Sequence, residues 1–160
     1  MLTGLLVVGH RLRRRPDPRP PAVTTTIGGL DVDAFETLAQ TRFRQLQAAW
    51  DAADHEALAR LTLGPLCRDL CEQLYARGGT AQHTEVLELH ARLLAVDRVQ
   101  TACLARVEFS GHRREQPGAA ACTFRELWWL AHTGAADPAA SESHGGGAAA
   151  WQVARVLAVD

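Results

Sequence analysis

The feature that most constrains the fold is an amphipathic stretch, residues 33–62, whose apolar side chains repeat with the period of an α-helix. They recur at steps of three or four and therefore form one stripe along a helix: Phe35, Ala39, Phe43, Leu46, Trp50 and Ala53. Asp33 and Glu36 are spaced as a capping box, which predicts the start of this helix. Because a stripe with two Phe and one Trp needs a broad apolar partner, the stretch is expected to be a rod that other elements enclose.

Two shorter helices are predicted after this rod. Asp54 can cap a helix over residues 55–61, because its side chain can accept a hydrogen bond from the first turn. Gly64-Pro65 predicts the start of a third helix. Proline suits the first turn because N–H groups there have no hydrogen-bond partner within the helix. Gly78-Gly79 ends that helix, since glycine adopts the left-handed terminal conformation without a side-chain penalty.

From Thr84 onward, apolar residues alternate with polar ones, as in half-buried strands. The sequence predicts strands over residues 84–97, 101–111, 122–132 and 151–159, turns at Asp97-Arg98 and Pro117-Gly118, and a long loop over residues 134–150. Alternation places Glu126 and Trp128 on one face of the third strand. In the last strand it places Arg155 on the same face as Trp151, Val153 and Leu157.

Helices followed by a four-stranded antiparallel meander indicate an α+β fold, with the helices packed on one face of the sheet. Leu127 and Trp129 make the second face of the sheet less polar than a fully solvated face would be. Either the sheet curls so that both faces are partly covered, or the second face is an interaction patch.

The N-terminal segment, residues 1–30, differs from the rest of the chain. Its apolar run over residues 2–9 is too short to cross a hydrocarbon core, which takes about 20 residues in a helix. The run is followed by an arginine cluster, an order typical of the cytoplasmic end of a membrane span. The cluster consists of Arg11, Arg13, Arg14 and Arg15. We interpret this segment either as the remnant of a membrane anchor with a proline-rich linker or as a disordered basic tail, and the domain is expected over residues 31–160.

Charge is distributed unevenly along the chain. Residues 1–30 hold five Arg and one Asp, a net charge of +4, and residues 31–160 hold 12 basic and 17 acidic residues, a net charge of −5. A mildly acidic domain argues against nucleic acid as a partner. The four cysteines lack the CxxC spacing of a zinc site, so they are interpreted as small buried thiols. The sequence predicts neither a metal nor a cofactor.

Several segments, taken in order, resemble the bacterial Tim-forty-four-like domain, which is related to the tether of the mitochondrial protein-import motor. They are LQAAWDAADHEALARLT, LYARGG, TEVLELHARLLAV, ARVEFSG and FRELWWL, and the resemblance covers residues 31–160. It implies a cone-like fold of the nuclear-transport-factor-two and cystatin type, in which a curved sheet wraps the long helix. It also implies a non-catalytic scaffold at the inner membrane, on the cytoplasmic side, that contacts lipid or a protein partner. Without such attachment the domain is expected to be cytoplasmic.

Three hypotheses about function follow. In the first, a cavity between helix and sheet binds a lipid chain or a peptide, its candidate walls being Trp50, Tyr75, Phe109, Trp128 and Trp151, while Arg11 to Arg15 contact the membrane. Glu126 and Arg155 are expected to meet as a buried ion pair. In the second hypothesis they are instead a general base and its orienting arginine, in an isomerase or hydrolase of the same fold. The third is a structural homodimer formed through the sheet.

Overall fold

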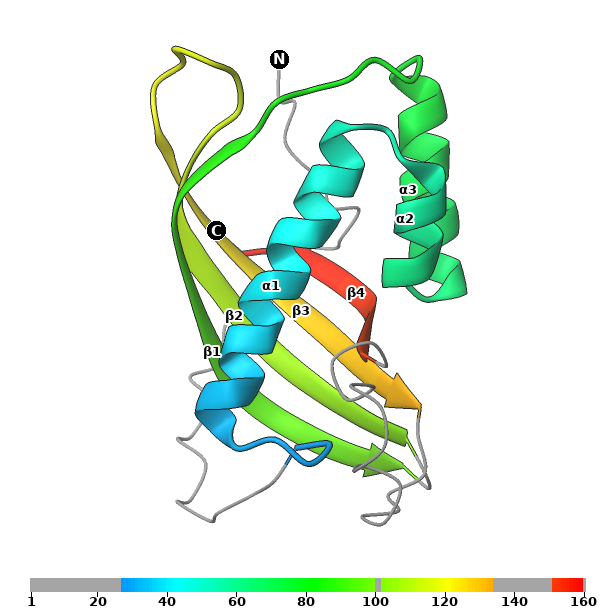
Figure 1. Cartoon of the computed structure of the whole chain (residues 1–160), viewed down its shortest axis with the longest axis vertical. Helices are drawn as coiled ribbons and strands as arrows, with labels where there is room; N and C mark the ends of the chain where they lie inside the picture. The colour runs from blue at the N-terminus through cyan, green and yellow to red at the C-terminus, as the bar shows by residue number, and fades with distance from the viewer. Residues whose placement is uncertain (1–26, 100–101, 134–150, 160) are drawn as a thin grey trace.

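The computed structural model describes residues 27–99, 102–133 and 151–159, and it confirms the α+β class (Figure 1). The helices come first: α1 (Val32–Asp51), α2 (His55–Leu61) and α3 (Gly64–Ala76). The strands follow: β1 (Glu85–Val99), β2 (Ala102–Arg114), β3 (Cys122–Thr133) and β4 (Trp151–Ala158). Residues 1–26 and the predicted loop 134–150 lie outside the described residues.

The strands form one antiparallel sheet in the order β1-β2-β3-β4. Figure 1 shows this sheet curving around α1, which crosses one of its faces diagonally. The predicted turn at Asp97-Arg98 is wrong, because both residues belong to β1 and pair with Leu104 and Cys103 of β2. Both are exposed, so their charges stay in water while the backbone pairing continues to Val99.

Two β-bulges, at Leu87 and Leu94, interrupt the register of β1 and β2, and bulges of this kind bend and twist a sheet. Leu87, which strict alternation with Leu89 would place on the core face, is exposed at the first bulge. After the second bulge Val96 packs against the core, whereas strict alternation would place its neighbour Ala95 there. The backbones also approach closely here, because a Cβ on Gly111 would overlap the carbonyl oxygen of Glu88.

Helix α1 begins two residues earlier than the predicted capping box. Asp31 is the N-cap, and its Oδ1 accepts a hydrogen bond of 2.7 Å from the backbone N–H of Ala34. Asp33 lies inside the first turn, so the predicted box is wrong. Glu36 instead accepts a 2.8 Å hydrogen bond from the backbone N–H of Leu93, beside the second bulge. The carboxylate thus satisfies a backbone donor of the edge strand and joins the helix to the sheet.

The aromatic stripe of α1 is confirmed as the centre of the core. Phe43 lies 5.0 Å from the ring of Phe109, 5.4 Å from Phe124 and 5.0 Å from Trp128, measured between ring centroids. About two turns nearer the N-terminus, Phe35 meets Trp151 of β4 edge-on at 4.9 Å. The rod therefore contacts β2, β3 and β4 through aromatic pairs.

A polar network ties the C-terminal end of α1 to the start of β1. The Asp51 carboxylate is buried and accepts hydrogen bonds from the Thr84 backbone N–H at 2.7 Å, the Thr84 hydroxyl at 3.1 Å and the Gln47 side-chain amide at 2.9 Å. Arg77 lies over the Trp50 ring at 4.8 Å and donates to the Trp50 carbonyl at 2.9 Å. This network holds the segment before β1 against the C-terminal end of α1.

Candidate binding site at the end of the sheet

The last strand of the sheet is shorter than the strand that it pairs with. β4 pairs with β3 only from Glu126 to His132, so β3 extends beyond it through residues 122–125. The backbone N–H of Val159 donates to the Arg125 carbonyl at 2.9 Å, which means that this carbonyl points away from β2. Because backbone groups alternate in direction along a strand, the N–H and C=O of Thr123 point the same way. No strand in the described part of the chain pairs with Thr123 on that side.

A pocket of about 540 Å³ opens beside this uncovered edge of β3. It draws on the ends of β2, β3 and β4, and its lining residues are Ser110, Arg113, Thr123, Phe124, Arg125, Glu126, Ala158 and Val159. The pocket therefore lies at the end of the sheet, and not in the space between α1 and the sheet where the sequence predicts a cavity.

A buried ion pair forms the inner wall of this pocket. The Glu126 carboxylate is 2% exposed and accepts hydrogen bonds from Arg113 Nη1 at 2.9 Å and from Trp128 Nε1 at 2.8 Å. The Arg113 guanidinium also lies over the Phe124 ring at 5.1 Å, and its side chain is 13% exposed. Its Nε has no hydrogen-bond partner in the described part of the chain. The cation and the carboxylate are thus held against the core at the inner wall of the pocket.

The predicted pairing of Glu126 with Arg155 is wrong. A register irregularity between Trp129 and Leu130 moves Arg155 to the outer face, where its guanidinium lies 5.1 Å from the Trp129 ring. The true partner, Arg113, was missed because β2 was predicted to end at Gly111. Continued alternation through Val107, Phe109 and Gly111 would have placed Arg113 on the core face.

The aromatic residues predicted as cavity walls lie elsewhere. Trp50, Phe109, Trp128 and Trp151 are buried in the core and belong to its packing. Tyr75 is 88% exposed, so its assignment to a cavity is wrong. The reason is helical geometry, because α3 buries Leu70 and Leu74 and the next residue points to solvent. Among the predicted site residues that the structure describes, Glu126 alone lines the pocket.

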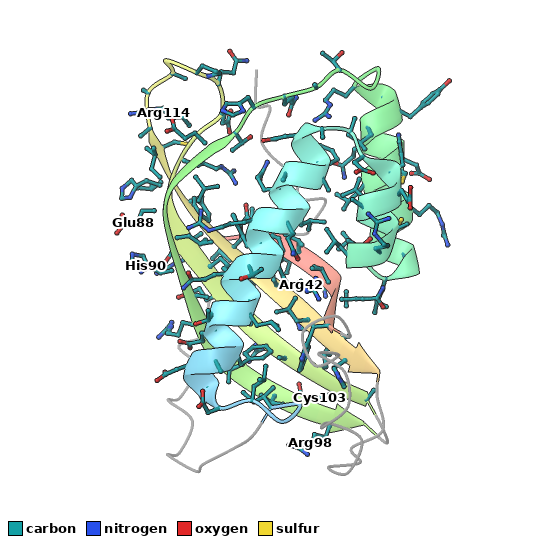
Figure 2. All side chains as sticks on the ribbon, in the orientation of Figure 1. Arg42, Glu88, His90, Arg98, Cys103 and Arg114 are labelled. Atoms are coloured by element: carbon teal, nitrogen blue, oxygen red, sulfur yellow. The ribbon has the colours of Figure 1, made fainter. Side chains whose placement is uncertain are left out.

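On the outer face of the sheet, charged side chains surround Leu127 and Trp129, which are half-buried. Glu108 accepts from Arg92 at 2.9 Å and lies 3.7 Å from Arg125. Figure 2 shows Glu88 and His90 projecting from β1 away from α1. Glu88 contacts His90 and His112 at 2.8 Å each, and these hydrogen bonds lower the pKa of its carboxyl group.

The cysteines are free, and the prediction that they are buried is wrong for Cys122, which is exposed. The others are half-buried, and burial together with neighbouring Cys67 raises the pKa of the Cys71 thiol, which lies 3.5 Å from the His55 ring. Within the described ranges, no group of three or more His, Cys, Asp or Glu residues is arranged to hold a metal ion. Nor does any helix in those ranges have the length and apolar character needed to cross a membrane.

No protein-family model matches the chain, and no curated protein matches it. Among solved structures, the chain is similar to the intermembrane space region of the chloroplast protein ARC6, with a TM-score of 0.48 and 10% sequence identity. The match covers 81% of this chain and 97% of that one. The resemblance to the Tim-forty-four-like domain stays a prediction.

Proposed function

We propose that the chain is a non-catalytic protein-binding domain whose binding site is the pocket beside the uncovered edge of β3. The observation that carries this proposal is the contrast between two parts of the sheet. On the core face, the Glu126 carboxylate is already bonded to Arg113 and Trp128. At the pocket, the backbone groups of Thr123 face outward with no partner strand among the described residues. Polar groups that lack a partner at a concave surface favour binding.

An enzyme of the same fold receives no support from the geometry. A general base must reach the proton that it removes, at about 2.6–3.2 Å between heavy atoms. Glu126 is 2% exposed and each of its oxygens already accepts a hydrogen bond, so a substrate would have to displace Arg113 or Trp128 first. The homodimer through the sheet remains a hypothesis, which light scattering over a range of protein concentrations tests.

The proposal includes the finer expectations that the sequence resemblance implies. These are a cone-like fold of the nuclear-transport-factor-two and cystatin type and a position at the cytoplasmic side of the inner membrane. The curvature of the sheet around α1 supports the first expectation (Figure 1). The arginine cluster of residues 11–15 supports the second, because basic segments are attracted to anionic lipid surfaces.

Pocket filling tests the protein-binding function. Short random peptides displayed on phage are selected on the immobilised full chain and then titrated against two variants. Ala158→Trp fills the pocket from an exposed position, and Ala48→Trp makes the same change at an exposed position of α1 that does not line the pocket. We expect Ala158→Trp to weaken binding about tenfold or more, a loss of about 1.4 kcal/mol, and Ala48→Trp to leave it unchanged. Selected peptides that bind both variants equally would place the site elsewhere.

A further inference from the structure

The shape and charge of the pocket identify a class of partner, and this inference rests on the proposed function. We propose that β3 binds an extended peptide segment as an additional antiparallel strand, and that this segment carries an acidic side chain which pairs with Arg125. Strand addition at a sheet edge is a general mode of peptide recognition, in which backbone hydrogen bonds supply affinity and alternate side chains supply specificity.

The register of such a strand follows from the pairing of β4. Ala158 lies opposite Glu126, and the Val159 N–H bonds to the Arg125 carbonyl. A segment that continues along the same edge would place its next residues opposite Phe124 and Thr123. Because Thr123 directs both its N–H and its C=O outward, it can exchange two hydrogen bonds with the residue opposite.

The outer face of the sheet determines which side chain fits opposite Thr123. That side chain would lie on the same face as Thr123 and Arg125, within reach of the Arg125 guanidinium. The Arg125 side chain is 38% exposed, and its Nε lies 3.7 Å from one oxygen of Glu108, whose other oxygen accepts a bond of 2.9 Å from Arg92. The guanidinium has five N–H donors, so it retains donors for a carboxylate from the partner.

The net charge of the pocket also favours an acidic side chain on the partner. Its lining contains Arg113 and Arg125 against Glu126 alone, which leaves one positive charge. On the core face, the neighbouring residue of the segment would meet the edge of the Phe124 ring and the Arg113 side chain. An apolar residue next to an acidic one is therefore the pattern that the two faces of β3 select.

Two protein variants test the backbone and the charge separately, with peptide affinities measured by fluorescence anisotropy. Thr123→Pro removes only an N–H that points away from β2, so it leaves the ladder with β2 intact, as proline on a sheet edge does. We expect it to weaken binding of the selected peptides about tenfold, since one hydrogen bond is lost and the peptide carbonyl that would accept it is left without a partner. Arg125→Gln is expected to weaken acidic peptides about threefold, whereas Arg44→Gln, at an exposed position of α1 outside the pocket, has no effect.

Changes in the peptide repeat the test without altering the protein. Methylating the peptide amide opposite Thr123 should abolish binding, and methylating either neighbouring amide should not, because alternate amides face away from β3. The methylation pattern therefore tests strand addition even if Thr123→Pro fails to fold.

The outcomes separate this inference from the proposed function. If Ala158→Trp abolishes peptide binding but Thr123→Pro and amide methylation have no effect, strand addition is wrong and the protein-binding site stands. If the selected peptides show no excess of acidic residues and Arg125→Gln has no effect, the acidic specificity is wrong. If anionic vesicles of phosphatidylserine and phosphatidylcholine bind in an Arg125-dependent way while no selected peptide depends on the pocket, a lipid headgroup replaces the peptide and both proposals fall.

Discussion

Replacing Arg113 with methionine removes the cation that faces the buried carboxylate of Glu126, and we expect this change to destabilise the fold strongly. The two side chains are 13% and 3% exposed, and Arg113 Nη1 lies 2.9 Å from the carboxylate. Removing one partner of a buried ion pair costs about 3–5 kcal/mol, because the other charge stays uncompensated. Trp128 still donates one hydrogen bond to Glu126. We therefore expect a loss near the lower end of that range, about 3 kcal/mol in the free energy of unfolding.

Urea titration at neutral pH, followed by tryptophan fluorescence, measures this loss. The double variant Arg113→Met with Glu126→Gln removes both charges, and the glutamine oxygen can still accept from Trp128. We expect it to be more stable than the single Arg113→Met variant, with a coupling energy of about 2 kcal/mol. Arg92→Met is the matched control, because its ion pair with Glu108 involves an exposed arginine and should contribute less than about 1 kcal/mol.

Two results would refute this account of the ion pair. One is an Arg113→Met variant that loses no more stability than Arg92→Met, which would mean that water reaches the Glu126 carboxylate. The other is a double variant whose loss equals the sum of the two single losses, since groups that do not interact have additive effects.

Gly111→Ala should destabilise the fold by about 2–3 kcal/mol, because the added methyl overlaps the Glu88 carbonyl and the backbone must shift. Gly64→Ala, where a Cβ meets open space, is its control, and equal unfolding midpoints in urea would contradict the close approach. The Glu88 carboxyl is expected to titrate below its ordinary range by NMR and to move upward when both contacting histidines are changed to glutamine. Since its folded pKa is depressed, any stability it contributes is present above the unfolded pKa and is lost as pH falls through the folded pKa. The 160-residue chain should sediment with anionic vesicles through the arginine cluster of residues 11–15, less so at high salt, and salt-insensitive sedimentation would argue against that cluster.

Much of the architecture could be predicted from the sequence because it depends on local periodicity. The aromatic stripe led by Phe43 and the alternation of Phe124, Glu126 and Trp128 place the same residues in the core that the structure buries. Helix and strand geometry alone produce these patterns, with steps of three to four residues and of two, respectively.

The candidate site could not be predicted in the same way. Arg155 shares a face with Val153 under strict alternation, but the irregularity in β4 separates them and buries Val156 instead. Asp33 and Glu36 have the spacing of a capping box, but in the structure Asp31 accepts the hydrogen bond of the first turn and Glu36 is bonded to the edge strand. Bulges and caps of this kind depend on neighbouring segments, which a local pattern does not contain.

The sequence by itself determined the α+β class, the order of the elements and most of the core, because each follows from the spacing of apolar residues. Only the tertiary structure decided where β4 stops along β3, and therefore that Thr123 is uncovered and a pocket opens beside it. It also decided that Glu126 is paired with Arg113. These features arise where residues distant in sequence meet, and the register of two strands is fixed by the contacts that they make together.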